Sequence, residues 1–365
     1  MNNNNNNNNN ISNNQKILIQ IKALLKSIAS QAKNGNQLTL TLPQIPSKSS
    51  SRVLRFPSPT SSSSSSAPPP FVVYVYILYQ MIQLIESNSI TTKRDLYYRN
   101  VPLFGSQKTV DRAVDAIAKS LNVQRIDLGV VAAPKSCVYI PNGSSITLFS
   151  ATGAFRDLVG DSLIPVDLVP VYIRLNGNFS SVLVVEKEAV YRQLCSTSSL
   201  SLQQTLIVTG KGFPDLSCRV FLATISVSHP TLPIYALVDS DPHGIAIYLA
   251  YKSGNLSSQA PPVPRLEYLG VSLSEYSNKA LRKAETHWID LNHRDVTLAI
   301  SLITSRNWSS SSCLEFNPVL RELQMGLFLF KKAEMNNATV VSNDEKIGNS
   351  IVDYVEFKLR PNQLS

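Results

Sequence analysis

Residues 232–254 read LPIYALVDSDPHGIAIYLAYKSG, and this stretch decides the fold of the second half of the chain. An apolar run is followed by the triplet Asp-Ser-Asp and then by a second apolar segment that is long enough for a helix. A short, continuous apolar run bounded by turn residues is typical of a strand that is buried on both faces. The stretch therefore predicts a buried strand, an acidic loop and a helix, in that order.

Two earlier stretches have the same form. SVLVVEKEAV (181–190) and TLIVTGKGFPD (205–215) each begin with an apolar run and continue into charged or turn residues. Short apolar strands that alternate with helices indicate a parallel sheet. In open α/β sheets, ligands bind at the carboxyl ends of the strands. Three acidic residues fall at such ends: Glu186, Asp239 and Asp241.

These three carboxylates form a candidate metal site. Side chains two residues apart in an extended chain leave on the same side, so Asp239 and Asp241 can converge. Glu186 can face them if its strand is a neighbour. A hard divalent cation would relieve their mutual repulsion, and we expect Mg²⁺. The structural alternative is that Asp241 caps the following helix, and Glu188 competes with Glu186 for the ligand role.

The first half of the chain predicts three helices and a hairpin. An apolar helix is predicted at 71–87, a second helix opens near residues 91–92, and 106–123 carries an apolar stripe at helical spacing. Residues 125–140 then predict two strands around a turn at Pro134. This is the order of a winged helix-turn-helix domain, whose third helix enters the major groove of DNA. The same order also occurs in plain scaffold domains.

The leader differs in composition from the rest. Residues 2–10 are all Asn and 47–70 is rich in Ser and Pro. We expect both to be disordered, because neither can bury enough apolar area to offset the entropy of ordering. Between them, residues 17–33 have apolar side chains at helical spacing. That pattern predicts a helix that docks either on a partner or on this protein's own body.

Charge and cysteine content exclude some classes of site. The net charge is +9, but seven of the 34 Lys and Arg residues precede the first acidic residue, Glu86, so most of the excess positive charge lies on the leader. It does not by itself indicate that the folded part binds nucleic acid. The four cysteines form no Cys-x-x-Cys pair, which argues against a zinc site or a disulfide framework. No segment has the roughly 20 apolar residues that span a bilayer.

Two adjacent tyrosines occur in TKRDLYYR, residues 92–99, and taken alone the pair favours core packing. Its neighbourhood changes this interpretation, because five segments together resemble the meiotic DNA double-strand-break proteins, the eukaryotic relatives of the topoisomerase VI A subunit. The resemblance covers roughly residues 71–335. The segments are KRDLYY (93–98), LFGSQKTVDRAVDAIAKSL (103–121), VLVVEKEAV (182–190), VTGKGFPD (208–215) and ALVDSDPHG (236–244).

The resemblance implies an organisation that combines α+β and α/β parts. After a leader at 1–70 comes a winged helix-turn-helix domain at 71–165 that carries a catalytic tyrosine. A Toprim α/β domain with a mostly parallel sheet and a C-terminal extension follows at 166–335, and a variable tail occupies 336–365.

The resemblance also implies the roles of the site residues. Tyr98 would be the nucleophile that attacks a DNA phosphate and becomes linked to the 5′ end, and Arg94 would assist it. Glu186, Asp239 and Asp241 would bind Mg²⁺. In this family the tyrosine of one copy works with the metal site of the other, so the active unit is a homodimer.

The spacing of the tyrosine motif suits these roles. A phenol is mostly protonated at neutral pH and needs a neighbouring cation or base to attack. Arg94 lies four residues before Tyr98, on the same face of a helix, where a fixed guanidinium can stabilise the phenolate or the transition state. Tyr97 points about 100° away from Tyr98, which suits core packing.

The function that follows is the formation of meiotic double-strand breaks that initiate homologous recombination. It implies double-stranded DNA, a topoisomerase VI B-like partner and accessory break-forming proteins, in the nucleus and without a membrane. The alternatives are a catalytically silent DNA-binding scaffold, a Toprim nuclease that forms no covalent bond, and a topoisomerase VI A subunit that works with an ATPase B subunit. The segment PKSCVYI (134–140) lacks the glycines common in the family, but it touches none of the site residues, so we expect catalytic competence.

Overall fold

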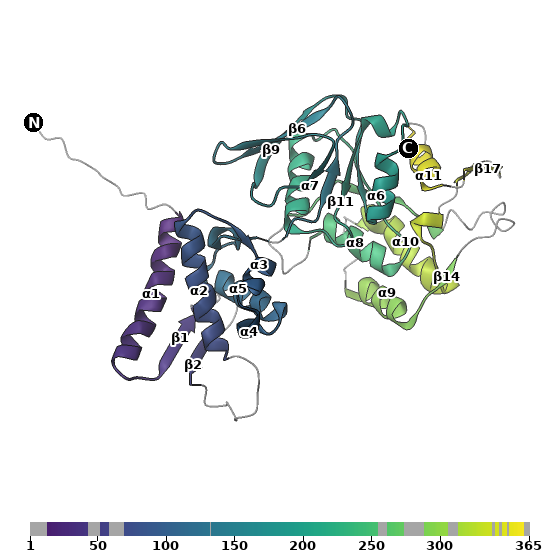
Figure 1. Ribbon diagram of the computed structural model, residues 1–365. Helices are drawn as coiled ribbons and strands as arrows, with labels where there is room; N and C mark the ends of the chain where they lie inside the picture. Colours follow the sequence, from purple (N-terminus) through teal and green to yellow (C-terminus); the bar gives the residue numbers. More distant parts are fainter. Residues whose placement is uncertain are drawn as a thin grey trace, which may run out of the picture. The chain divides into compact units, whose positions relative to one another are not determined.

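The computed structural model shows two compact units, which divide between Ala133 and Pro134 (Figure 1). This boundary differs from the one expected near residue 165, because the strands between 137 and 163 belong to the second unit. The residues that the structure describes are 13–42, 52–57, 69–131, 133–254, 261–273, 288–305, 313–337, 340–342, 345–348 and 350–360.

Helices dominate the first unit. The predicted helices are confirmed, and their residues form one core. An antiparallel pair, β1 and β2, and a two-residue parallel pair, β3 and β4, complete it. The elements are α1 (Asn13–Lys33), β1 (Leu38–Leu42), β2 (Arg52–Phe56), α2 (Pro70–Glu86), β3 (Thr91–Thr92), α3 (Lys93–Arg99), α4 (Val101–Phe104), α5 (Gln107–Leu121), the 3-10 helix η1 (Ile126–Leu128) and β4 (Val130–Val131).

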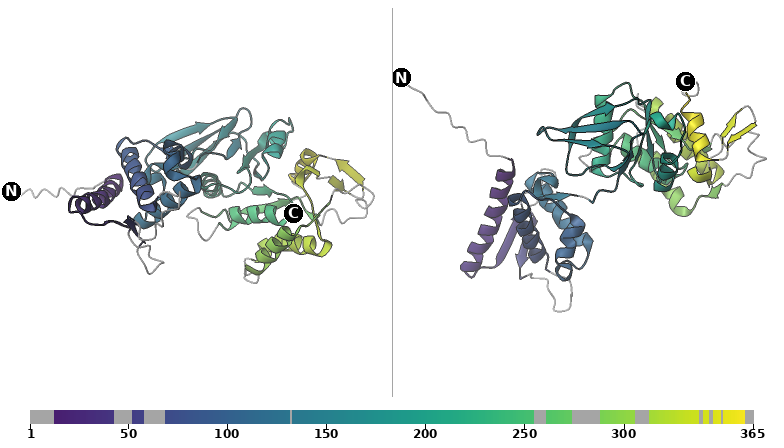
Figure 2. Two further views of the ribbon diagram at one scale, coloured as in Figure 1. Left: turned by 60° about the horizontal axis from the view of Figure 1, so that its bottom comes forward. Right: turned by 45° about the horizontal axis from the view of Figure 1, so that its top comes forward.

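Part of the leader belongs to this core. Helix α1 lies alongside α2 (Figure 2), and its side chains Ile17 and Ile21 are buried together with Leu40 and Leu42 of β1. Of the two possibilities for the predicted helix, docking on the protein's own body is therefore the one observed. The structure differs from the expected disorder at residues 52–56, which form β2. The Asn run at 2–10 lies outside the described residues.

Substitution of Ile21 by alanine tests this packing. Ile21 is 0% exposed, and a buried Ile-to-Ala change leaves a cavity, so we expect a loss of about 2–5 kcal/mol in the unfolding free energy of the first unit. Ile19, on the same helix but 58% exposed, is the matched control, and its alanine variant should change stability by less than about 0.5 kcal/mol. Hydrogen exchange of the α2 amides measures both effects. Equal effects of the two variants would contradict the packing of α1.

The predicted hairpin around Pro134 is wrong. Strand β4 pairs with β3 in the first unit, whereas the next strand, β5 (Cys137–Tyr139), joins the large sheet of the second unit. The segment between them is thus a connection between two units and not a tight turn. Residues 126–128 form a 3-10 helix where the first predicted strand was expected to begin, and β4 lies within the rest of that strand.

The second unit is built on a six-stranded sheet in the order β13-β12-β10-β11-β5-β8. Four neighbouring strands are parallel, and the last two are antiparallel additions, so the predicted mostly parallel sheet is confirmed. The strands besides β5 are β8 (Asp161–Leu163), β10 (Ser181–Val185), β11 (Thr205–Thr209), β12 (Ile234–Leu237) and β13 (Leu266–Gly270).

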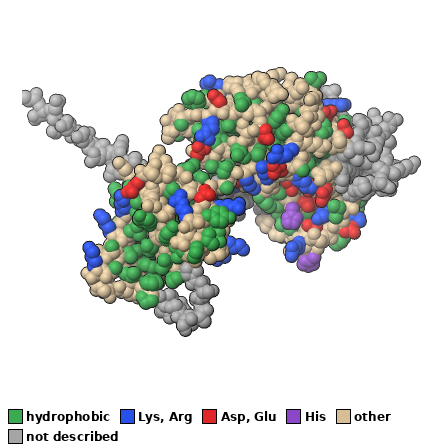
Figure 3. All heavy atoms as spheres, in the orientation of Figure 1, with side chains coloured by type: hydrophobic (Ala, Val, Ile, Leu, Met, Phe, Trp, Pro, Cys, Tyr) green, Lys and Arg blue, Asp and Glu red, His purple; other side chains and the backbone are tan. Residues whose placement is uncertain are grey.

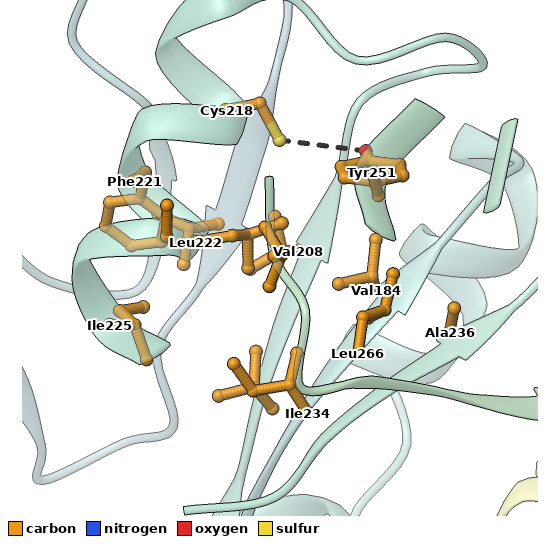
Figure 4. Close-up of a cluster of buried hydrophobic side chains, with 14 of the residues drawn as sticks. Val184, Val208, Cys218, Phe221, Leu222, Ile225, Ile234, Ala236, Tyr251 and Leu266 are labelled. Carbon is orange, nitrogen blue, oxygen red and sulfur yellow. Dashed lines mark hydrogen bonds between the residues drawn. The ribbon is translucent and has the colours of Figure 1, made fainter. Parts of the chain in front are cut away.

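Successive residues of each central strand face opposite layers, which explains the continuous apolar runs. On one face, Val184, Val208 and Ala236 pack against helices α7 (Leu216–Ser228) and α8 (Pro242–Lys252) (Figure 4). The buried thiol of Cys218 and the hydroxyl of Tyr251 lie 3.7 Å apart on this face. The opposite face is covered by α6 (Glu188–Cys195) and α11 (Ile351–Lys358), so the expected variable tail contributes to the core.

Further elements surround the sheet. An antiparallel three-stranded sheet, ordered β7-β6-β9, packs on the α7 face. No helix among the described residues has the length and apolar character needed to cross a bilayer. The remaining elements are β6 (Ser145–Ser150), β7 (Phe155–Leu158), β9 (Pro170–Asn176), η2 (Leu202–Gln204), β14 (Ile289–Asp290), α9 (His293–Ser305), α10 (Cys313–Leu329), β15 (Lys331–Lys332), η4 (Met335–Asn337), β16 (Val340–Ser342) and β17 (Glu345–Gly348).

Candidate functional site

The tyrosine motif forms α3, a short helix with a well-defined start. Thr92 is its N-cap, as predicted: the Asp95 backbone N–H donates to Thr92 Oγ1 (3.0 Å) and the Thr92 N–H donates to Asp95 Oδ2 (3.2 Å). The Thr92 hydroxyl, which also donates to Asp95 Oδ2 (2.8 Å), and then the Thr92 N–H lower the pKa of Asp95. Leu96 is fully buried, and Lys93 Nζ lies 2.8 Å from Asp115 Oδ1 of α5. The helix is therefore fixed in rotation, which determines which side chains reach solvent.

The two tyrosines have different environments. Tyr97 is half-buried and packs against the core of the first unit, whereas Tyr98 is 59% exposed. Arg94 Nη2 donates to Tyr98 Oη at 3.5 Å, and its guanidinium carbon lies 5.7 Å from the centre of the Tyr98 ring. The hydrogen bond with Tyr98 raises the pKa of Arg94. An exposed phenol thus has a permanent cation beside its oxygen.

Glu186 and Asp239 come together at the carboxyl end of the sheet. Strands β10 and β12 are neighbours in parallel register, with Val185 opposite Leu237, so the residues that follow them meet. The Asp239 backbone N–H donates to Glu186 Oε2 at 2.9 Å. Burial, followed by the charge of Asp239, raises the pKa of Glu186 to about 7. Burial also raises the pKa of Asp239, which is 6% exposed.

Asp241 caps helix α8, which was the structural alternative to its predicted role as a metal ligand. Its Oδ1 accepts a hydrogen bond of 2.6 Å from the Gly244 N–H, and it is the N-cap of α8. Its charge nevertheless contributes to the raised pKa values of Glu186 and Asp239. A Cβ on Gly244 would lie 2.4 Å from the Asp239 carbonyl oxygen, so only glycine allows the helix to begin this close to the acidic pair.

Asp239 is held by partners from both sides of the site. Lys187, which follows Glu186, places its Nζ 2.7 Å from Asp239 Oδ2 and 3.2 Å from Glu334 Oε2. The backbone N–H of Met335 donates to Asp239 Oδ1 at 2.9 Å. Both carboxylate oxygens of Asp239 are therefore engaged.

The chemistry of the acidic pair fits a hard divalent cation. Glu186 and Asp239 offer carboxylate oxygens, and their burial and mutual repulsion favour a cation between them. Across the described ranges, however, no group of three or more His, Cys, Asp or Glu side chains is arranged so that it could hold a metal ion. Of the three predicted ligands, Glu186 and Asp239 therefore meet, whereas Asp241 is turned toward the N-terminus of α8.

The other charged residues near the site have structural partners. Glu188 Oε1 lies 2.7 Å from Arg192 Nη2 and 3.1 Å from Lys211 Nζ, which lowers the pKa of Glu188. His243 is exposed, with its Nε2 3.7 Å from Asp295 Oδ1. Figure 3 shows acidic, basic and histidine side chains intermixed over α8 and α9.

Comparison with protein families accounts for both units. Residues 181–349 match the model of the Toprim domain of the topoisomerase 6 A-subunit/Spo11 proteins, and residues 69–130 match that of type IIB DNA topoisomerase. The meiotic recombination protein rec12 of Schizosaccharomyces pombe is 33% identical over 250 residues, which are 68% of this chain and 68% of that protein. The chain belongs to the topoisomerase 6 A-subunit/Spo11 family.

Further relatives carry two kinds of name. The meiotic recombination protein SPO11 of Homo sapiens is 28% identical over 322 residues, 82% of this chain and 73% of the human protein. The A subunit of DNA topoisomerase 6 from Arabidopsis thaliana is 31% identical over 257 residues, 68% of this chain and 57% of that protein. The topoisomerase 6 A-subunit/Spo11 family thus includes relatives named for recombination and relatives named for topoisomerase activity.

The segment after α10 is a part of the Toprim site that the sequence did not reveal. Ala333 forms an antiparallel bridge with Ser240, the residue between Asp239 and Asp241. The Ser240 hydroxyl also donates to Glu322 Oε2 at 2.9 Å, and Glu322 is only 5% exposed. Resemblance near residue 333 was visible in the sequence, but no local pattern connected it with the acidic loop.

Proposed function

We propose that this protein breaks both strands of DNA in meiosis by tyrosine transesterification and stays attached to the 5′ ends, which initiates homologous recombination. The observation that carries the proposal is the exposed hydroxyl of Tyr98 beside Arg94, on a helix whose other tyrosine packs into the core. Membership of the topoisomerase 6 A-subunit/Spo11 family supports it, as do relatives named meiotic recombination proteins.

In the proposed reaction, Tyr98 Oη attacks the phosphorus of a DNA phosphodiester. A tyrosine–phosphorus bond forms while the bond from phosphorus to the 3′ oxygen breaks. The phenol proton leaves to solvent or a base, and the 3′ oxygen departs as a hydroxyl after it gains a proton. Arg94 stabilises negative charge on the phenol oxygen and on the phosphoryl group, because its guanidinium is fixed beside the hydroxyl.

We propose that Glu186 and Asp239, with Asp241 close by, hold Mg²⁺. A bound cation would supply positive charge for the DNA phosphate and for the departing oxygen. The support lies in the donor set: Glu186 is partly buried and Asp239 is buried, and burial followed by the charge of Asp239 raises the pKa of Glu186 to about 7.

DNA binding is proposed for the first unit through a helix-turn-helix, although β4 and β5 do not form the hairpin that would be its wing. Helix α5 buries Val110, Val114 and Ile117 and exposes Lys108 and Arg112. These two side chains are available for phosphates, which position a protein on DNA without specifying sequence. The affinity for DNA should therefore fall steeply with salt.

The proposed active unit is a homodimer in which the tyrosine of one copy works with the acidic site of the other. Tyr98 and the acidic pair belong to different compact units, which is compatible with such sharing. A topoisomerase VI B-like partner, accessory break-forming proteins and a nuclear location complete the proposal.

The test is a search for this protein covalently attached to DNA 5′ ends in meiotic cells. We expect adducts on both strands at broken sites, with free 3′ hydroxyls opposite them. Breaks without attached protein would favour a Toprim nuclease. Absence of both breaks and adducts, with the partner proteins present, would leave a DNA-binding scaffold.

The role of a topoisomerase VI A subunit is the second candidate function, and the Arabidopsis relative named for topoisomerase 6 favours it. Its distinguishing property is resealing. Purified protein mixed with a B-type ATPase partner, ATP and supercoiled DNA would relax that DNA if the second candidate is correct. Accumulated linear DNA with attached protein would support the break-forming role instead.

Replacement of Arg94 tests the cation beside the phenol. We expect Arg94→Gln to lower the adduct yield by about 10²-fold, because it removes the charge that stabilises the reacting oxygens. Arg94→Lys should retain part of the activity, since lysine keeps the charge but not the planar geometry. The melting temperature should not change, because Arg94 is exposed and its hydrogen bond is with the exposed Tyr98. An unchanged adduct yield in Arg94→Gln would contradict the assigned role.

A further inference from the structure

Lys187 occupies an unusual position between two carboxylates that come from distant parts of the chain. Its ammonium group lies 2.7 Å from Asp239 Oδ2, at the end of β12, and 3.2 Å from Glu334 Oε2, just after β15. The Asp239 carboxylate is almost buried, with its side chain 8% exposed, whereas the Glu334 side chain is 42% exposed. One cation thus connects an interior carboxylate with one at the surface.

Neighbouring lysines are committed to other carboxylates. Lys211 pairs with Glu188, and Lys332 pairs with Asp295. Among the ion pairs that the described residues form, the one with Lys187 is the pair that involves Asp239. Lys187 therefore offsets negative charge of the acidic pair.

Lys187 and a metal ion would compete for the same carboxylate. Asp239 Oδ1 accepts the Met335 N–H at 2.9 Å, and Lys187 Nζ lies 2.7 Å from Oδ2, so both oxygens already have a donor. An ammonium ion and a divalent cation on one carboxylate would repel each other strongly in a partly buried site. Glu334 offers the lysine a second carboxylate within reach of its present position.

We propose that Lys187 is an internal counter-cation that fills the place of the divalent metal on Asp239 and moves fully to Glu334 when the metal binds. This inference rests on the proposed metal-dependent function and deepens it. Lys187 keeps the acidic pair assembled without metal, and the cost of moving it sets the metal affinity. Glu334 is a positioning residue that receives the lysine.

The experiment measures metal binding by the purified full-length protein without DNA. MgCl₂ and, separately, MnCl₂ are titrated while the melting temperature is recorded, and calorimetry gives the dissociation constants. We expect Lys187→Gln to bind the metal about tenfold more tightly, because a repelling charge is removed, and to melt at a lower temperature in chelator. Lys211→Gln is the matched control, since both lysine side chains are 27% exposed, and its affinity should stay near that of wild type.

Combination with Glu334→Gln separates transfer of the lysine from simple attraction of charges. Glu334→Gln alone should weaken metal binding several-fold, because the displaced Lys187 has lost its acceptor. In the Lys187→Gln background the same change should have no effect. An equal effect in both backgrounds would overturn the transfer, and unchanged or weaker binding by Lys187→Gln would overturn the competition.

Two further outcomes are decisive. If Lys187→Gln does not fold, Lys187→Arg takes its place: a guanidinium that binds Asp239 more firmly should weaken metal affinity, and unchanged affinity would overturn the proposal. A wild-type protein that binds neither cation would overturn this proposal together with the metal part of the proposed function. If wild type binds the metal and Lys187→Gln binds it with the same affinity, this proposal is overturned and the metal part of the proposed function stands.

Discussion

Replacement of Tyr98 by phenylalanine is expected to abolish the covalent protein–DNA adduct, with a loss of at least about 10³-fold, while the fold is unchanged. The substitution removes only the hydroxyl that would form the bond to phosphorus. Tyr98 is 59% exposed, and its hydroxyl bonds to Arg94 alone among the side chains of the described residues, so little stability depends on it. Adducts are counted in meiotic cells, and protein level and dimerisation are measured in parallel.

Tyr97→Phe is the matched control for this variant. The two tyrosines are adjacent, and their rings are 5.3 Å apart between centroids, but Tyr97 packs against the core of the first unit. A phenylalanine keeps the packed ring, so adducts should form at close to the wild-type level. If Tyr97→Phe eliminated the adduct and Tyr98→Phe did not, the assignment of the nucleophile would be reversed.

Glu186→Gln should have opposite effects on the stability of the metal-free protein and on formation of the DNA adduct. Partial burial, followed by the charge of Asp239, raises the pKa of Glu186 to about 7, so its charge opposes folding when no metal is present. A neutral amide can still accept the Asp239 N–H, and it should stabilise the metal-free protein at pH 8 by about 1–3 kcal/mol. The same change removes a proposed metal ligand and should eliminate the metal-dependent adduct.

The sign of this stability effect follows from the direction of the pKa shift. A carboxyl group whose pKa is raised on folding binds more protons in the folded state, so stability is lost as the pH rises from about 4.5 to about 7. The advantage of Glu186→Gln should therefore be present at pH 8 and small at pH 4.5, in buffer with chelator. Glu188 lies two residues away, is partly exposed and has a lowered pKa, so Glu188→Gln should give no such gain. A stabilisation of Glu186→Gln that did not depend on pH would contradict the argument.

The sequence predicted well those elements that are determined by local periodicity. Helices α2 and α5 and the buried strands β10, β11 and β12 follow from apolar spacing over 4 to 17 residues, and the start of α3 follows from its N-cap. The hairpin at Pro134 was wrong because β5 matches a strand pattern but finds its partner, β11, some 70 residues later in the chain. Local patterns specify that a strand exists, and they do not specify which edge it joins.

The same limit applies to the candidate site. Glu186 and Asp239 could be selected from strand ends, whereas Tyr98 was selected through the resemblance to the family, and helix spacing then placed Arg94 beside it. The partners of Asp239 could not, because the Met335 N–H that holds Oδ1 is 96 residues away in sequence and is a backbone group, which carries no residue signature. The capping role of Asp241 was visible as an alternative, and the structure shows that role.

The bridge between Ser240 and Ala333 has a consequence for protein synthesis. The ribosome completes Glu186 and Asp239 long before it reaches the residues that hold them. A nascent chain released before residue 331 would carry both acidic residues, yet it would lack Glu334, the Met335 N–H and the Ala333 bridge. Early termination or an altered reading frame after residue 330 would therefore leave a protein that retains every predicted catalytic residue but lacks the contacts that hold Asp239.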